Sequence, residues 1–234
     1  MESATFDVQR LLPALPLFSD LSPPERERIA QGCQLKHLAG SETLFRAGQP
    51  CDAFYVVVSG QIKLYVASGD GHEKVIELIG PSRSFAEAMV FMGSPHVVNA
   101  QALSDTLLLC VCKRAVLDEV ARDPRFALHM LAGISRRLHG LIQDVEGYAL
   151  HSGMQRMIGY LLRDAEAAQN DGSQPNCLTV HLPASKATVA SRLSLTPEYF
   201  SRVLHELEAQ GLIRIDKRDI HIADVSRLAS FGSR

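Results

Sequence analysis

The stretch 182–211, LPASKATVASRLSLTPEYFSRVLHELEAQG, contains two short helical patterns joined by a tight polar turn. In the second pattern, apolar side chains recur at helical spacing and would anchor the helix to a small core. They are Phe200, Val203, Leu204 and Leu207. Polar side chains repeat the same spacing on the opposite face, namely Glu198, Ser201, Arg202 and His205. A helix with a carboxylate, a hydroxyl and a guanidinium near its N-terminal end can offer donors and acceptors to base edges in a DNA major groove.

The ends of these two helices are marked by capping residues. Thr196 is expected to be an N-cap, Pro197 the first helical residue and Gly211 the C-terminal stop of the second helix. The first helix is expected to start at Ser185. The segment therefore predicts a helix-turn-helix, with an ordinary helical hairpin and a solvated polar face as the alternative.

Two short β patterns, LIRID and DIHIAD, follow the second helix and flank Lys217 and Arg218. They predict a winged hairpin beside the helix-turn-helix. Basic and polar side chains gather around this region, where DNA phosphates need partners, although a solvated basic face is the alternative. The candidate phosphate or auxiliary contacts are Lys186, Arg192, Thr196, His205, Lys217 and Arg218.

The first half of the chain shows different sequence patterns. Residues 6–33 show short amphipathic helical patterns broken by prolines, and residues 35–115 show short β-rich runs separated by Gly, Asp and Ser turns. These runs predict an antiparallel β-roll or barrel.

A long helix is predicted over about residues 124–150, and its apolar residues follow a heptad. Leu128 and Ile142 widen the apolar face beyond a strict seam, so the helix is expected to pack on its own roll and also on a second copy of the chain. Packing on the roll alone is the alternative. The predicted dimer seam consists of Leu131, Ile134, Leu138, Leu141, Val145 and Tyr148.

The composition excludes several classes of protein. The chain of 234 residues has room for two domains, and its net charge of −2 argues against a protein that coats nucleic acid. Its five cysteines show neither a disulfide framework nor paired zinc-ligand spacing, and Cys110 and Cys112 are interpreted as small buried hydrophobes. No signal peptide or membrane span is expected, which favours the cytoplasm and no membrane partner.

Together these elements resemble the Crp/Fnr superfamily of bacterial transcription regulators. The segments that carry the resemblance are PLFSDLSPPERERIA, FRAGQPCDAFYVVVSGQIKLY and TPEYFSRVLHELEAQGLI. The resemblance implies an α+β protein with three parts. These are a cyclic-nucleotide-binding-like sensor roll with a helical lead-in (1–121), a dimerisation helix (122–151) and a winged helix-turn-helix (152–234). The implied partners are double-stranded DNA, a second copy of the chain and, for an activator, RNA polymerase. No enzymatic activity is implied.

The resemblance also implies which residues read DNA. Fnr-like members open the recognition helix with an E-x-x-S-R pattern, which stands here as Glu198, Ser201 and Arg202. Members with this triad read half-sites like TTGAT, so a palindrome of TTGAT, four free bases and ATCAA is implied. Arg202 can donate two hydrogen bonds to guanine, and Glu198 can accept one from cytosine.

The effector is predicted from positions at which this chain differs from other members of the superfamily. Cyclic-nucleotide members carry an Arg-Ser or Arg-Thr pair for the phosphate, whereas this chain has His96-Val97, so cyclic AMP is disfavoured. Iron-sulfur members use a tight N-terminal cysteine cluster, which is missing, so no such cluster is expected. The segment FAEAMVFM at 85–92 resembles the Dnr branch, which implies nitric oxide sensing through haem in an apolar pocket. The candidate pocket residues are Phe85, Glu87, Met89 and His96, and no axial ligand or metal site is assigned.

Two other functions remain as alternatives. The first is a cyclic-nucleotide-responsive regulator of the same superfamily. The second is a cupin-like metal enzyme built in the roll. The histidines of the roll region, His37, His72 and His96, stand far apart and match no metal-ligand motif, which disfavours the enzyme.

Overall fold

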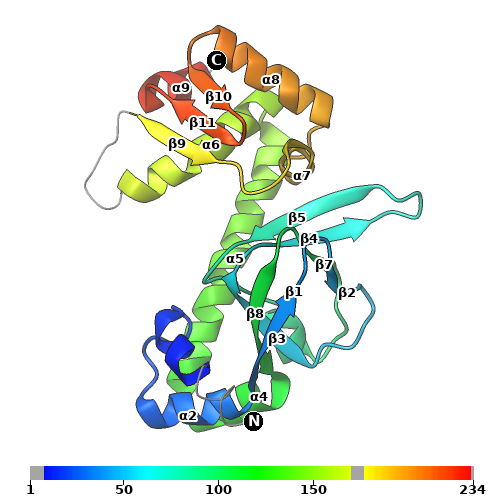
Figure 1. Cartoon of the computed structure of the whole chain (residues 1–234), viewed down its shortest axis with the longest axis vertical. Helices are drawn as coiled ribbons and strands as arrows, with labels where there is room; N and C mark the ends of the chain where they lie inside the picture. Colours follow the sequence, from blue (N-terminus) through cyan, green and yellow to red (C-terminus); the bar gives the residue numbers. More distant parts are fainter. Residues whose placement is uncertain (1–7, 170–176, 233–234) are drawn as a thin grey trace. The chain divides into compact units, whose positions relative to one another are not determined.

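The computed structural model of the chain describes residues 8–169 and 177–232, which form two compact units divided between Gly140 and Leu141 (Figure 1). Antiparallel sheets and separate helices make up both units, which confirms the predicted α+β class. The first unit contains η1 (Leu12–Ala14), α2 (Pro23–Gln31), β1 (Cys33–Leu38), β2 (Thr43–Phe45), β3 (Ala53–Ser59), β4 (Ile62–Ala67), β5 (Glu73–Ile79), β6 (Ser84–Phe85), α3 (Glu87–Met92), β7 (Asn99–Ala102), β8 (Thr106–Cys112), α4 (Lys113–Arg122) and the first part of α5 (Pro124–Leu150).

The β-roll consists of two four-stranded antiparallel sheets. Their strand orders are β1-β8-β3-β6 and β2-β7-β4-β5. Apolar side chains from both sheets meet in one core, to which Phe45, Ile62, Phe85 and Leu108 contribute. The predicted antiparallel roll is therefore confirmed.

The first sheet is buried on both faces. Along β3, Val57 enters the core between the sheets, while Phe54 and Val56 point to a second core beneath the helices. That second core contains Ile29 of α2 and Phe126 of α5. A strand buried on both faces reads as a continuous apolar run, which explains the uninterrupted apolar sequences of β3 and β8.

Cys33 lies in the second core, and Cys110 packs against the core between the sheets. Burial raises the pKa of Cys33 to about 12 and that of Cys110 to about 11. Both thiols stay protonated at neutral pH and act as small apolar groups. Cys110 and Cys112 are both half-buried, so the predicted burial of these two side chains is only partial.

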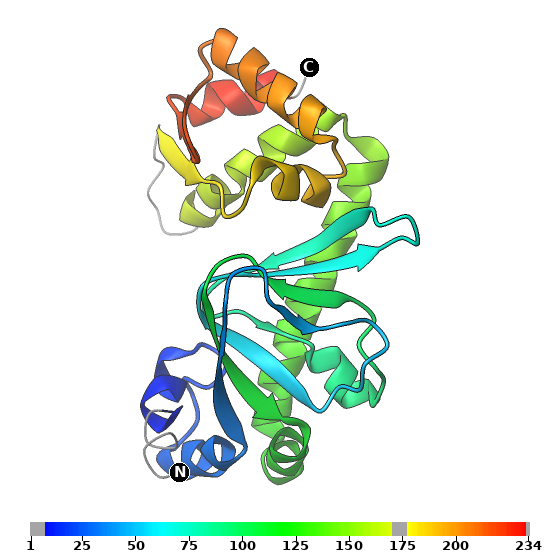
Figure 2. The same cartoon turned by 45° about the vertical axis from the view of Figure 1, so that its right-hand side comes forward.

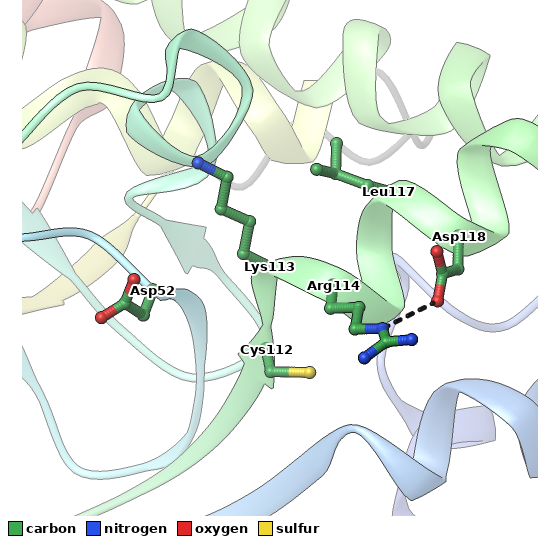
Figure 3. Close-up of a pocket in the computed structure, with 6 residues that line it drawn as sticks. All are labelled: Asp52, Cys112, Lys113, Arg114, Leu117 and Asp118. Atoms are coloured by element: carbon green, nitrogen blue, oxygen red, sulfur yellow. Dashed lines mark ion pairs between the residues drawn. The ribbon is translucent and has the colours of Figure 1, made fainter.

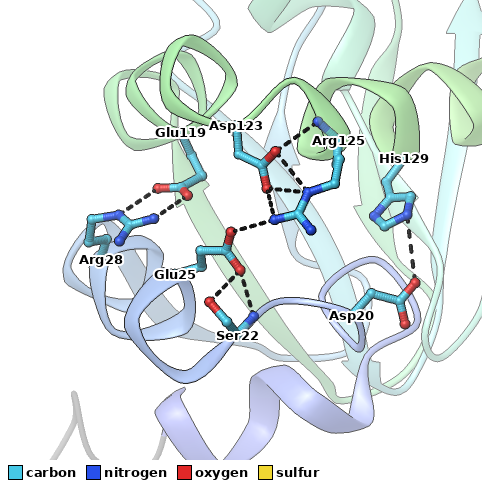
Figure 4. A network of polar contacts seen from close by, with 8 residues as sticks. All are labelled: Asp20, Ser22, Glu25, Arg28, Glu119, Asp123, Arg125 and His129. Atoms are coloured by element: carbon cyan, nitrogen blue, oxygen red, sulfur yellow. Dashed lines mark hydrogen bonds and ion pairs between the residues drawn. The ribbon is translucent and has the colours of Figure 1, made fainter.

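Ion pairs attach α2 to the start of the long helix (Figure 4). Arg28 of α2 donates to both carboxylate oxygens of Glu119 on α4, at 2.6 and 3.0 Å. Asp123 separates α4 from α5 and accepts from the backbone N–H of Arg125, which caps α5. Hydrogen bonds from the Arg125 side chain are the main reason why the pKa of Asp123 falls to about 2. Arg125 also reaches Glu25 of α2 at 3.4 Å.

Helix α5 covers Pro124–Leu150, as the heptad pattern predicts. Its first part runs along the roll in both views (Figures 1 and 2), and Phe126 and Met130 are buried there. Ser152 and Gln155 then form reciprocal bonds between side chain and backbone, at 2.8 and 3.2 Å. This capping box marks the start of α6.

The second unit is built around a winged helix-turn-helix. After α6 (Gly153–Gln169) come β9 (Leu178–His181), α7 (Lys186–Arg192), α8 (Pro197–Ala209), β10 (Ile213–Asp216), β11 (Asp219–Ile222) and α9 (Val225–Gly232). Strands β10 and β11 form the predicted hairpin, and β9 extends it to the order β10-β11-β9. The sequence patterns miss α3, α4, β9 and α9, all of which are short elements. Within this unit α7 packs on α8, and α9 packs on α6.

Candidate nucleic-acid interface and sensor site

Side-chain caps fix both helices of the helix-turn-helix. The hydroxyl of Ser185 accepts from the Thr188 backbone N–H at 3.1 Å and starts α7. The hydroxyl of Thr196 accepts from the Tyr199 N–H at 3.2 Å and starts α8. Beyond the end of α8, Gly211 has a φ of +65°, a conformation that glycine adopts without strain. The expected caps are therefore present.

Helix α8 has one buried and one exposed face. Phe200, Val203, Leu204 and Leu207 are at most 1% exposed, whereas Glu198, Arg202 and His205 are exposed and Ser201 is half-buried. The structure thus brings the predicted reading residues together on one accessible face.

Two of the exposed side chains have defined local contacts. The guanidinium of Arg202 lies over the Tyr199 ring, 4.8 Å from its centre. A ring nitrogen of His205 lies 2.7 Å from the Ser201 carbonyl oxygen, one turn earlier. A carbonyl oxygen only accepts, so Nδ1 is the donor in this contact, and in the neutral ring Nε2 is then an acceptor.

The predicted phosphate contacts separate into two groups. Lys217 and Arg218 are exposed at the turn between β10 and β11, and Lys217 has a φ of 56° there. Lys186 is half-buried at the start of α7, and Thr196 is exposed and serves as the cap of α8. Lys186 and Thr196 thus belong to the helix-turn-helix itself, and Lys217 and Arg218 belong to the wing.

The position of Arg192 contradicts its predicted role as a phosphate contact. Its side chain is 9% exposed, and a guanidinium nitrogen lies 2.5 Å from a carboxylate oxygen of Asp144 on α5. Another nitrogen donates to the hydroxyl of Tyr148 at 2.8 Å, and that hydroxyl donates to the Arg192 carbonyl oxygen at 2.7 Å. The predicted phosphate role is wrong in this structure, because the guanidinium is buried and already paired.

The turn after α7 receives further donors from α6. Arg156 donates to the carbonyl oxygens of Leu193 at 3.0 Å and Ser194 at 3.3 Å. The last carbonyls of a helix have no partner within the helix and need such donors. Asp144, Tyr148, Arg156 and Arg192 together hold the turn. The sequence gives one signal for this cluster, because Asp144 and Tyr148 are four residues apart and so share one face of a helix.

The predicted seam is largely exposed in the single chain. Leu131, Leu138 and Val145 are 57, 58 and 65% exposed. Leu128 and Ile142 extend this apolar stripe, at 63 and 57%. Tyr148 differs from the other members, since its hydroxyl bonds to Arg192. The exposed stripe is the kind of surface that a second copy can bury.

The candidate effector residues do not line one cavity. Phe85 is fully buried beside the ring of Tyr55, with ring centres 5.3 Å apart. His96 is 4% exposed and stacks on Phe45 at 3.5 Å, and burial lowers its pKa. Met89 packs on the core beneath the helices.

Glu87 is held by the long helix. Its carboxylate is 2.9 Å from Nη1 of Arg137 on α5, and Nε of Arg137 lies 3.0 Å from the Glu77 carboxylate. A further nitrogen of Arg137 donates to the Ser84 carbonyl oxygen. Ala86, directly before Glu87, has a φ of 71°, which is uncommon for alanine. Two carboxylates and one carbonyl therefore already surround the guanidinium.

Two surface pockets lie elsewhere. One of about 460 Å³ is lined by Asp52, Cys112, Lys113, Arg114, Leu117 and Asp118 (Figure 3). Another, of about 480 Å³, is lined by residues of the wing sheet that include Thr179, Arg214 and His221.

In the described part of the chain, no three His, Cys, Asp or Glu side chains are grouped for a metal ion. None of the described helices is long and apolar enough to span a membrane.

Two family models match the chain. Residues 35–123 match the cyclic nucleotide-binding domain, and residues 155–231 match the Crp-like helix-turn-helix domain.

Known proteins match over most of the chain. The CRP-like cAMP-activated global transcriptional regulator of Mycobacterium tuberculosis is 23% identical over 91% of this chain and 94% of its own. The sensor domain of the transcriptional regulator DNR from Pseudomonas aeruginosa is 35% identical over 61% of this chain and 95% of that structure, with a TM-score of 0.53. A second structure, of DNR from Pseudomonas aeruginosa, is 37% identical over 95% of this chain and 96% of that chain, with a TM-score of 0.49. FixK2 from Bradyrhizobium japonicum shares the fold at 22% identity, covering 85% of this chain and 96% of its own, with a TM-score of 0.74.

Proposed function

The chain belongs to the Crp/Fnr family of DNA-binding transcription regulators, and from this premise we propose that it reads a TTGAT-type palindrome as a homodimer. Its domains and relatives are those of regulators and not of enzymes. The observation that carries the proposal is the exposed face of α8, where Glu198, Ser201 and Arg202 lie together. We place its action in the cytoplasm, on chromosomal DNA.

The chemistry of this face matches the half-site. The guanidinium of Arg202 can donate two parallel hydrogen bonds to O6 and N7 of guanine, and the Glu198 carboxylate can accept from the N4 amino group of cytosine. The Ser201 hydroxyl can approach a thymine edge. Lys217 and Arg218 carry charge that suits phosphates on either side of the groove.

A dimer supplies the second reading helix. Palindromic half-sites one helical turn apart require two copies of α8 related by a two-fold axis. The exposed apolar stripe of α5 supports a pairing of long helices that provides this symmetry. For an activator, RNA polymerase is the further partner.

We expect the wild type to bind the TTGAT palindrome far more tightly than a scrambled duplex at the same salt concentration. Arg202→Ala should cost about 1 to 3 kcal/mol and flatten the preference at the guanine. Lys217→Ala is the matched control, because loss of a phosphate contact should weaken both duplexes alike. Equal wild-type affinity for the two duplexes in a salt-controlled titration contradicts the proposed reading.

For the effector, we propose nitric oxide sensed through haem, as the resemblance of residues 85–92 to the Dnr branch implies. The identity with the DNR sensor domain supports the branch. The alternative is a cyclic nucleotide, supported by the match of residues 35–123 and by the cAMP-activated relative.

Neither ligand fits the candidate residues as they are packed. Phe85 and His96 fill the roll core, so these side chains leave no common space for haem, and no step of the switch is derived through it. Glu87 is already paired with Arg137, and no arginine stands at 96–97 for a cyclic phosphate. Haem would therefore require a second conformation of the sensor, whereas no change of conformation supplies the arginine that a cyclic phosphate lacks here.

The effector proposal predicts a Soret absorption band in protein purified from haem-replete cells. Haem with nitric oxide should raise the affinity for the palindrome, and millimolar cyclic AMP should not. A change from 1:99 to 99:1 in favour of the active state needs about 5.5 kcal/mol of differential binding. The control is the scrambled duplex, whose binding should not respond. Tight, specific binding restored by cyclic AMP alone, with no effect of haem, contradicts the proposal.

A further inference from the structure

The guanidinium of Arg202 is held by a ring on its own helix. Its central carbon lies 4.8 Å from the centre of the Tyr199 ring, three residues earlier. Residues three apart are neighbours on a helix surface, and this distance suits a cation–π attraction. Arg202 is exposed and Tyr199 is half-buried. A partly fixed ring therefore supports a side chain that would otherwise sample many rotamers in solvent.

The Tyr199 ring also packs closely against Gly153, the first residue of α6. A Cβ added to Gly153 would lie 2.6 Å from Cε1 and 3.0 Å from Cζ of Tyr199, and 2.9 Å from Cδ2 of Leu195. Real Cβ atoms do not approach other atoms this closely, so only glycine leaves room for the ring. The half-buried ring of Tyr199 therefore packs close to the backbone of Gly153 and also contacts the exposed guanidinium of Arg202.

Arg202 has a competing partner on the same face. Glu198 lies four residues earlier, and a glutamate placed four residues before an arginine is a favourable helical ion pair. Among the residues that the structure describes, no ion pair joins Glu198 to Arg202, and the guanidinium lies on the ring instead. A pair between them would occupy both groups that are proposed to read bases.

We propose that Tyr199 is a specificity-determining residue. Its ring positions Arg202 for guanine and prevents an ion pair between Arg202 and Glu198. Gly153 leaves the space that the ring occupies. The proposal rests on the function proposed above. A guanidinium must place two N–H groups on O6 and N7 at once, so a preset orientation favours guanine over other bases. Ordering the side chain before binding also lowers the entropy lost on binding.

The test compares variants on two duplexes that differ by one acceptor. One is the TTGAT palindrome, and the other carries 7-deazaguanine, which lacks N7, at the half-site guanine. Tyr199→Leu should reduce the preference for the natural guanine by about three- to tenfold, whereas Tyr199→Phe, which keeps the ring, should preserve it. Gly153→Ala should act in the same direction as Tyr199→Leu, because it displaces the ring. In an Arg202→Ala background, Tyr199→Leu should change the preference no further.

A readout without DNA separates positioning from folding. The side-chain protons of Arg202 should show an upfield ring-current shift in NMR spectra that Tyr199→Phe keeps and Tyr199→Leu loses. If Tyr199→Leu does not fold, Gly153→Ala provides the same comparison with the ring retained. Equal weakening on both duplexes, or a Tyr199→Leu effect that persists without Arg202, overturns the proposal. A wild type that does not distinguish the palindrome from a scrambled duplex overturns the proposed function instead.

Discussion

Leu138→Glu is expected to make the protein monomeric and to weaken its binding to palindromic DNA by ~100-fold or more. Leu138 is 58% exposed in the middle of the apolar stripe on α5. Pairing of two long helices would bury a glutamate there against apolar side chains without a cation, and an unpaired buried charge is strongly unfavourable. The monomer would hold one half-site at a time and lose the gain from a second, linked contact.

Sedimentation at several concentrations and a DNA titration check this expectation. Arg136→Glu is the matched control, because it places the same side chain at an exposed position of α5 on the face away from the stripe. It should leave both the dimer and the affinity unchanged. A Leu138→Glu protein that still sediments as a dimer shows that the dimer interface lies elsewhere.

Arg192→Ala is expected to lower the free energy of unfolding of residues 141–234 by about 3 kcal/mol. The carboxylate of Asp144 is 20% exposed, so losing its partner leaves a mostly buried, uncompensated charge. The Tyr148 hydroxyl loses a donor at the same time. DNA affinity should also fall, because the turn between α7 and α8 loses part of its attachment to α5.

Calorimetry of the full chain measures the stability, and a salt titration of DNA binding separates the two roles of Arg192. Arg218→Ala is the control, since removing an exposed arginine should change stability by no more than about 0.5 kcal/mol. Combining Arg192→Met with Asp144→Leu should recover part of the loss, because two apolar groups replace the buried pair. Unchanged stability with a shallower salt dependence would instead restore the phosphate-contact role of Arg192.

Local sequence signals determined the long elements. The heptad repeat predicts α5 over 124–150, and the observed helix is Pro124–Leu150. The two faces of α8, its cap at Thr196 and the wing hairpin are also encoded locally. Periodicity and caps act within a few residues, so they can be recognised without knowing any distant contact.

Short elements with distant partners were not predictable in this way. Strand β9 pairs with β11 across about 40 residues of sequence, and its four residues form no periodic pattern of their own. Helices α4 and α9 are similar cases, because their packing on α2 and α6 supplies their stability. Tertiary packing regularly overrides weak local propensity.

The sequence by itself determined the class of protein and which residues share the exposed face of α8. Only the tertiary structure decided the partner of each polar side chain. Arg192 looked like Lys217 in sequence, yet one is buried on Asp144 and the other is exposed in the wing. Glu87 and His96 looked like pocket residues, yet one holds Arg137 and the other stacks on Phe45. Periodicity specifies which face of an element is buried, but the partner of a charge is set by elements far away in sequence that fold against it.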